Sequence, residues 1–233
     1  MSYDRALNRF SFNGRLFQTE YAMNAVSNGA TVLAIQSEDM IVIAVEKQDL
    51  MQLQQIESVS KVCILDDHVM CGYAGMNSDA RVLFNKAQIE CQSHRLTFED
   101  PISIERIARY IATIQLRYTQ IGGVRPFGVA SLICGFDTFN KPHIYETIPC
   151  GSFSEWKARS IGKFGHPAQE YLEKLYVDGL NEYNTLKIAI GAMREIADCR
   201  PKNIGVTTMK PNEGIRSLTE DEIQSFVTDI ESR

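Results

Sequence analysis

The segment from Gly128 to Phe136 reads Gly-Val-Ala-Ser-Leu-Ile-Cys-Gly-Phe and contains no charged residue. A strand that keeps one face in water alternates apolar and polar side chains, whereas a continuous apolar run is typical of a strand buried on both faces. The sequence therefore predicts a central strand here, with packed layers on either side of its sheet.

The other strands are expected mainly in pairs. Polar residues 36–39 separate the first two apolar runs and Asp66-Asp67-His68 separates the next two, so both pairs are interpreted as hairpins. A partner of the central strand follows it directly, and one more strand is expected near the carboxyl end. The expected strands are residues 31–35, 40–45, 62–65, 69–73, 128–136, 143–147 and 204–208.

Apolar residues at helical spacing and cap residues predict the first helices. The first covers residues 16–26 and is expected to stop at Gly29 in a left-handed conformation. Ser78 is expected to cap the second helix, and Pro101 and Ser103 open the third. The apolar positions of the first helix, at helical spacing, are Phe17, Tyr21, Ala22, Ala25 and Val26. Those of the second, on one face, are Ala80, Leu83, Phe84, Ala87 and Cys91. Those of the third, expected to form its buried stripe, are Ile104, Ile107, Ala108, Ile111 and Tyr118.

Further helices are expected at residues 167–176 and 185–197, and Thr219 with Glu222 forms a capping box for a closing helix. Strands and helices thus alternate in groups rather than singly. This order predicts an α/β (α+β) layered sandwich, with helices outside and two sheets inside. With 233 residues, 44% of them hydrophobic, a single domain is expected.

Charge and composition argue against several classes of function. The formal net charge is −5 and no dense Lys/Arg stripe occurs, which argues against nucleic acid or an anionic membrane as a partner. No apolar run of about 18 residues and no signal peptide is found, so a soluble protein that is not exported is expected. The six cysteines lack C-x-x-C spacing and the four histidines are scattered. Reduced thiols are therefore expected, with no metal site and no cofactor.

The N-terminal residues form a motif that resembles the signature of the alpha subunits of the proteasome. It consists of Tyr3-Asp4-Arg5, Phe10-Ser11, Gly14-Arg15-Leu16-Phe17-Gln18 and Glu20-Tyr21-Ala22. Further segments, in the same order and with matching spacing, resemble the same family. They are Val45-Glu46-Lys47, Leu65-Asp66-Asp67, Gly75 with Asp79-Ala80-Arg81, Arg117-Tyr118-Thr119-Gln120 and Arg125-Pro126-Phe127-Gly128. Within the family, residues 1–6, 90–97 and 99–101 resemble the member at the fourth alpha position of the eukaryotic ring.

The resemblance implies a four-layer αββα sandwich of the N-terminal-nucleophile hydrolase type with an extra N-terminal helix. Residues 1–233 would form one domain, with residues 1–29 as gate segment and ring-surface helix and residues 30–233 as the sandwich core. It implies a ring of seven alpha subunits stacked on a ring of catalytic beta subunits. Activators would dock through their C-terminal tails. The particle would serve ubiquitin-dependent and ubiquitin-independent protein degradation in the cytoplasm and nucleus.

No catalytic residue is expected in this chain. Catalytic subunits of this fold use an N-terminal threonine whose free α-amine is the general base. Ala30 stands at that place and has no hydroxyl, and the amine of Thr31 is held in a peptide bond unless the chain is cut before it. Ser152 lacks the G-x-S-x-G elbow, and Cys134 lies within the apolar central strand.

Two alternatives stay open on the sequence. An active N-terminal-nucleophile hydrolase would have a mature N-terminus at Thr31. A free-standing binding protein would instead be a stable monomer.

The resemblance implies that Tyr3, Asp4, Arg5 and Tyr21 lie at the gate and between neighbouring subunits, with the tyrosines and the aspartate holding the open gate by hydrogen bonds. The alternative for Tyr21 is an aromatic residue that only packs within its helix. Only two residues precede Tyr3, a reach of about 7 Å. The chain is therefore expected to frame the gate rather than to plug it.

One turn departs from the family pattern. Where the family has Ser-Pro-Asp-Gly, this chain reads Ser11-Phe12-Asn13-Gly14. Proline fixes φ and phenylalanine does not, but Asn-Gly still favours a tight turn, so a turn is expected here.

Lys61 matches the lysine that, in alpha subunits, lines a pocket between neighbours and pairs with the C-terminal carboxylate of activators. Beside it, the resemblance implies a close backbone approach at Gly29 and an apolar wall at Met76. The alternative is an ordinary solvated lysine in front of a strand.

Overall fold

The computed structural model describes residues 10–47, 60–196, 203–211 and 213–231. In chain order its elements are α1 (Phe17–Ser27), β1 (Val32–Gln36), β2 (Ile41–Glu46), β3 (Val62–Asp66), β4 (Val69–Gly75), α2 (Asn77–Phe98), α3 (Ile104–Gln120), β5 (Val129–Phe136), β6 (Pro142–Thr147), β7 (Phe153–Trp156), β8 (Ala158–Ile161), α4 (Gly165–Leu175), α5 (Glu182–Ile196), β9 (Ile204–Lys210), β10 (Gly214–Ser217) and α6 (Glu220–Glu231). Within these residues no helix is long and apolar enough to cross a membrane. The same residues contain no group of three or more His, Cys, Asp or Glu placed to hold a metal ion.

Two five-stranded sheets form the centre of the molecule. Their strand orders are β10-β9-β2-β1-β8 and β3-β4-β5-β6-β7. Strand β5 pairs with β4 on one side and β6 on the other, and all of its residues are buried. The predicted central strand is therefore confirmed, as are the two hairpins β1–β2 and β3–β4.

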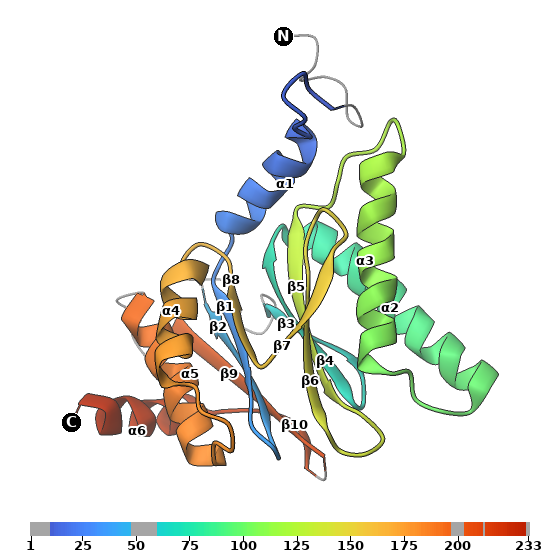
Figure 1. The fold of residues 1–233 in the computed structure, drawn as a ribbon. Coiled ribbons are helices and arrows are strands. Elements are labelled where there is room, and N and C mark those ends of the chain that lie inside the picture. The colour runs from blue at the N-terminus through green and yellow to red at the C-terminus, as the bar shows by residue number, and fades with distance from the viewer. Residues whose placement is uncertain (1–9, 48–59, 197–202, 212, 232–233) are drawn as a thin grey trace, which may run out of the picture.

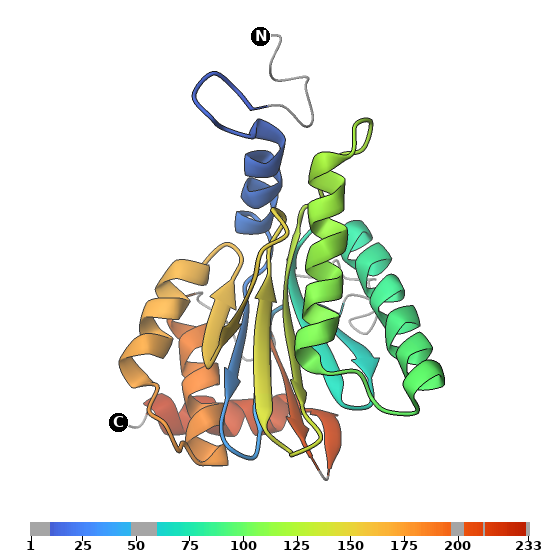
Figure 2. The same ribbon diagram turned by 45° about the vertical axis from the view of Figure 1, so that its right-hand side comes forward.

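Helices cover the outer face of each sheet, as Figures 1 and 2 show. Helices α2 and α3 pack on the second sheet in a buried apolar cluster that includes Ile107. Helices α4, α5 and α6 pack on the first sheet in a cluster that includes Ile190. A third cluster lies between the sheets and brings Ile43 together with Leu132. The three clusters separate four layers, so the predicted αββα sandwich is confirmed.

Helix α1 stands outside these layers, at the end of the sandwich where β4 ends and β5 begins (Figure 1). Of its 11 residues only Ala22 and Val26 are buried. The predicted extra N-terminal helix is therefore present, one residue later than expected at each end.

Three strands were not predicted: β7, β8 and β10. Each is four residues long, and each lies at the edge of its sheet. An edge strand is only partly buried, so its sequence carries a weak apolar pattern; β7, for example, reads Phe-Ser-Glu-Trp and has no buried residue. The expectation that the strand at residues 204–208 is the last was wrong for this reason.

Two predicted helix ends were also wrong. Helix α2 begins at Asn77, so its N-cap is Met76, whose side chain makes no capping bond, and Ser78 lies inside the first turn. The Met76 N–H instead donates to the carbonyl of Gly128 at 3.0 Å, so a tertiary contact sets the start of the helix. At the end of α1, the capping residue Asn28 is right-handed and Gly29 has no positive φ.

Other predicted caps are confirmed. The Ser103 hydroxyl accepts from the N–H of Arg106 at 3.4 Å at the start of α3. Before α6, the N–H of Thr219 donates to the Glu222 carboxylate at 2.9 Å and the N–H of Glu222 donates to the Thr219 hydroxyl at 3.4 Å. This pair is the predicted capping box.

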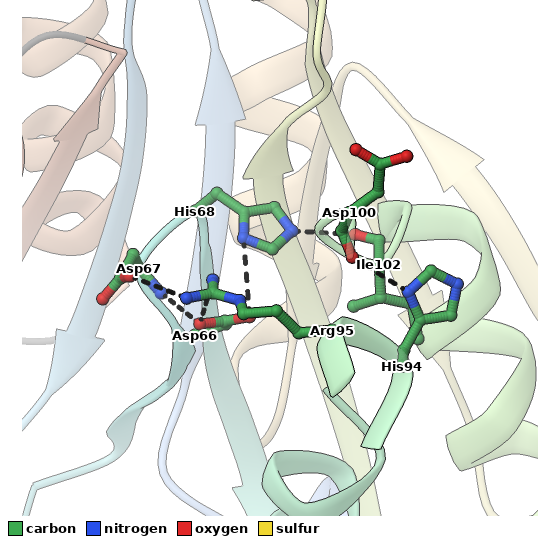
Figure 3. Close-up of polar contacts among 7 residues, drawn as sticks. All are labelled: Asp66, Asp67, His68, His94, Arg95, Asp100 and Ile102. Carbon is green, nitrogen blue, oxygen red and sulfur yellow. Dashed lines mark hydrogen bonds and ion pairs between the residues drawn. The ribbon is translucent and has the colours of Figure 1, made fainter. Parts of the chain in front are cut away.

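The turn between β3 and β4 is tied to the carboxyl end of α2 by the polar contacts in Figure 3. Arg95 donates to the buried carboxylate of Asp66 at 2.8 Å and lies 3.4 Å from that of Asp67. The His68 ring donates from Nε2 to the carbonyl of Ile102 at 2.7 Å, in the segment between α2 and α3. The Leu65-Asp66-Asp67 motif therefore fixes a helix to a hairpin.

Truncation of Leu132 to Ala should lower the free energy of unfolding by about 2–5 kcal/mol, because it leaves a cavity between the two sheets. The matched control is Leu96→Ala on α2, where the leucine is 86% exposed and little should change. Urea unfolding of the full chain measures both variants. Equal losses for the two would contradict the assignment of the inter-sheet core.

Candidate functional site

The candidate site lies where α1 meets the sandwich. We call it the junction and define it by Gly29, Lys61, Gly75, Met76 and Gly128. It brings together all three residues that the sequence assigned to the activator pocket. They come from the end of α1, the start of β3 and the residue before α2.

Backbone segments approach one another very closely at the junction. A Cβ on Gly29 would lie 2.3 Å from the backbone nitrogen of Gly75. A Cβ on Gly75, whose φ is +109°, would lie 2.1 Å from the carbonyl oxygen of Gly128. Distances this short exclude any side chain at either position. Gly29 is therefore a glycine because of this close approach and not because it ends a helix.

An ion pair holds the junction from the side of α2. The Asp79 carboxylate accepts two hydrogen bonds from the Arg125 guanidinium, at 2.6 and 2.7 Å, and a third from the N–H of Gly128 at 3.0 Å. Burial alone would raise the pKa of Asp79, but these hydrogen bonds and the charge of Arg125 outweigh it and lower the pKa. The motif that contains Asp79 and the motif that begins at Arg125 are thus in direct contact.

Lys61 is buried, with 7% of its surface exposed. Its Nζ donates to Asn77 Oδ1 at 2.5 Å and to the carbonyl of Gly75 at 3.4 Å, and it lies 4.7 Å from the centre of the Tyr73 ring. The alternative of a solvated lysine is therefore wrong. Burial lowers the pKa of Lys61. Among the residues that the structure describes, no carboxylate forms an ion pair with it.

Met76 and Asn77 lie at the rim of the junction. Met76 is 43% exposed, and Asn77 is exposed at the first position of α2. The buried ammonium of Lys61 therefore has an apolar side chain and an amide as neighbours at the surface.

The outer face of α1 is only partly covered. Tyr21 is 47% exposed, and its ring stacks on that of Phe17 with centroids 6.3 Å apart. Arg15 and Glu20 form an exposed two-bond ion pair at the start of the helix, at 2.7 and 2.8 Å. The other residues assigned to the gate, Tyr3, Asp4 and Arg5, lie outside the described residues.

The turn before α1 forms without proline. The N–H of Gly14 donates to the carbonyl of Ser11 at 2.9 Å, and the N–H of Ser11 donates to the carbonyl of Arg15 at 2.8 Å. Phe12 is 99% exposed and contributes no packing to the turn. The expected Asn-Gly turn is thus present.

Thr31, the residue beside the expected position of a catalytic threonine at Ala30, is enclosed by its surroundings. Thr31 is 1% exposed, and its hydroxyl accepts from the N–H of Phe164 at 3.2 Å. Its own N–H donates to the Glu46 carboxylate at 2.9 Å. The N–H of Lys163 donates to the carbonyl of Gly29 at 2.9 Å, so the segment before α4 covers this part of the chain.

The other nucleophile candidates have surroundings that do not activate them. Ser152 is near the Cys150 thiol, 3.3 Å away, and among the described residues no histidine contacts it. Burial raises the pKa of Cys134 strongly and that of Cys91 to about 12, so both thiols stay protonated at neutral pH.

The sequence did not assign Asn77 or Tyr73 to the site, although both contact Lys61. It also did not single out the contacts of Thr31 with Glu46 and Phe164. Asn77 follows a glycine and a methionine at a helix start, and nothing in that pattern marks its contact with a lysine 16 residues earlier. Such contacts depend on how a strand and a helix are placed in the fold.

Comparison with known proteins gives two family matches. Residues 26–209 match the model described as proteasome subunit. Residues 3–25 match the model described as the N-terminal signature of the A-type proteasome subunit.

Curated relatives are similar along almost the whole chain. Proteasome subunit alpha type-7 of Solanum lycopersicum is 48% identical over 231 residues, which is 99% of this chain and 89% of the relative. Proteasome subunit alpha type-7-B of Arabidopsis thaliana is 47% identical over 232 residues, covering 99% and 92%. Proteasome subunit alpha type-7 of Dictyostelium discoideum is 46% identical over 230 residues, with the same shares.

The ion pair of Asp79 should make stability depend on pH in the acid range. A carboxyl group whose pKa is lowered by folding contributes stability above its unfolded pKa of about 4, and this contribution is lost as the pH falls through the folded value. Asp79→Asn should therefore destabilise the protein at about pH 7 and much less at about pH 3. Urea midpoints of wild type and variant across this range measure the effect.

Asp100→Asn is the matched control, because Asp100 is exposed and its carboxylate forms no ion pair with another described residue. It should leave the urea midpoint unchanged at both ends of the range. A gap between wild type and Asp79→Asn that stays constant with pH would count against the ion pair as its cause.

Proposed function

We propose that this chain, which belongs to the proteasome subunit family, is a non-catalytic subunit of the outer alpha ring. The family match makes it an alpha-type member of the 20S core that assembles with other proteasome subunits. In that ring it helps to assemble the heptamer, frames the gate for substrates and docks activators. The single observation that carries the proposal is the closed environment of Thr31.

A threonine nucleophile needs an accessible hydroxyl and a free α-amine to act as general base. Here the Thr31 hydroxyl is buried and occupied, and the nitrogen of Thr31 is an amide that donates to Glu46. The preceding helix α1 packs against β4 and β5, so cutting the chain before Thr31 would discard a folded element. An active hydrolase is therefore the weaker hypothesis.

The role at the gate is supported by the face of α1. Among the described residues Tyr21 is 47% exposed and Phe17 is partly buried, so both present some aromatic surface. Tyrosine suits interfaces because its ring is apolar and its hydroxyl is polar. We assign Tyr21, with Tyr3, Asp4 and Arg5, to contacts with neighbouring alpha subunits around the pore. A free-standing monomer would leave this face exposed.

The role in docking is supported by the charge of Lys61. A buried ammonium that has only neutral partners among the described residues still attracts an anion, and the C-terminal carboxylate of an activator tail would supply one. Gly29 and Met76 would form the floor and the wall for the residues of that tail.

The remaining parts of the proposal rest on family membership alone. They are service in ubiquitin-dependent and ubiquitin-independent degradation, contact with beta-ring subunits, and residence in the cytoplasm and nucleus. Microscopy of a tagged chain would test the compartments.

Thr31→Ala should leave every peptidase activity of the assembled particle unchanged, because this hydroxyl is not a nucleophile. Thr31→Ser, which keeps a hydroxyl, is the control for effects of packing. Intact-mass measurement of the chain from the wild-type particle should show the residues before Thr31 still attached. Loss of one activity in the Ala variant alone, or a mature N-terminus at Thr31, would sink the non-catalytic assignment.

Lys61→Ala should weaken activator binding at the pocket containing it by about tenfold, equivalent to about 1.4 kcal/mol. Native mass spectrometry should find the particle intact, because Lys61 does not lie in an apolar core cluster. Lys174→Ala, on the exposed surface of α4, is the matched control. Activator affinity unchanged by Lys61→Ala would refute the docking role.

A further inference from the structure

The closest polar contact of Lys61 is the side chain of Asn77. The Asn77 Oδ1 atom accepts from Lys61 Nζ at 2.5 Å, across 16 positions of the sequence. Lys61 is buried, whereas Asn77 is exposed at the first position of α2. An amide at the surface thus holds a cation beneath it.

The hydrogen bonds of the ammonium are made to neutral groups. Asn77 takes the shortest one, the carbonyl of Gly75 takes a long one at 3.4 Å, and the face of Tyr73 lies 4.7 Å away. An ammonium group has three donors, and these neighbours occupy its surroundings without cancelling its charge. Of the two hydrogen bonds, the one to the carbonyl of Gly75 is the longer and weaker. A carboxylate that binds Lys61 would therefore replace this bond with the smaller loss of free energy.

The start of α2 adds positive potential at the same point. Met76, the N-cap residue, makes no side-chain capping bond, so its side chain does not offset the positive end of the dipole of this 22-residue helix. The acidic residue of that turn, Asp79, is already bound to Arg125 and to Gly128. Lys61 and the helix end therefore attract the same kind of ligand.

We propose that Asn77 is the positioning residue of this pocket, which holds the Lys61 ammonium where a carboxylate can reach it. Its neutral oxygen positions the Lys61 ammonium but leaves the positive charge available, and its NH₂ group can donate to the same ligand. An aspartate of nearly the same shape at this position would pair with Lys61 and fill the pocket with its own anion. The inference rests on the proposed docking role of Lys61.

The test uses the assembled particle and two probes, a peptide with a photo-reactive residue near a free C-terminal carboxylate and the same peptide with an amidated C-terminus. Cross-linking to this chain is quantified by mass spectrometry, with the other alpha subunits as internal reference. The measured quantity is the ratio of labelling by the acid to labelling by the amide. Packing changes alone would not alter this ratio.

In wild-type particles the acid should label this chain at least tenfold more than the amide. Asn77→Asp should bring the ratio close to one, whereas Asn77→Ala, which keeps the charge of Lys61 uncancelled but no longer holds the ammonium in place, should lower it by about threefold. A ratio in Asn77→Ala equal to that of wild type would overturn the inference. Asn77→Asp places an acid in the first turn of a helix, where it is favourable, so the variant should fold and assemble. Native mass spectrometry verifies assembly.

The outcomes separate the two levels of the proposal. If wild type shows no preference for the acid, or if Lys61→Ala keeps that preference, the docking role itself fails. If Lys61→Ala loses the preference but Asn77→Asp retains it, the docking role stands and the inference about Asn77 is overturned.

Discussion

The close approach of backbone at the junction is the constraint on which the site depends. A Cβ on Gly29 would clash with Gly75, and a Cβ on Gly75 would clash with Gly128. Gly75 also holds a positive φ that few other residues adopt. This contact places the end of α1 against the start of α2. It also turns the carbonyl of Gly75 toward Lys61, so the position of the ammonium follows from the packing of glycines.

Burial has opposite consequences for the two reactive side chains of this region. The hydroxyl of Thr31 is buried and accepts a hydrogen bond from the N–H of Phe164, so it is not accessible to a substrate. The ammonium of Lys61 is also buried with hydrogen bonds, but its charge is not cancelled by a described carboxylate, and a buried charge without a counter-ion is costly. The aromatic face of Tyr73 offsets part of that cost. Burial thus argues against Thr31 as a nucleophile and supports the proposed role of Lys61 in binding an anion.

The sequence predicted the elements whose residues are mostly buried, because burial leaves a clear apolar pattern. Strand β5 is buried on both faces and was found from its apolar run, whereas β7, β8 and β10 lie at sheet edges, where half-exposed residues blur the pattern. The capping box at Thr219 is local and was predicted, but the start of α2 is set by Gly128, some fifty positions away, and was missed. The site divides in the same way: Lys61 and Gly29 followed from a family resemblance, and Asn77 could be found only once β3 and α2 were placed side by side.

Helix α1 has little packing of its own against the other described residues. A helix of 11 residues is marginal in water and depends on packing, and only Ala22 and Val26 are buried here. A neighbouring subunit that packs on Tyr21 would stabilise α1. Because Gly29 follows α1, the same packing would also stabilise the backbone contact between Gly29 and Gly75. An anion that binds Lys61 acts on the carbonyl of Gly75 from the other side. If the proposed ring contact and the proposed anion both act on this carbonyl, binding of one would alter the free energy of binding of the other.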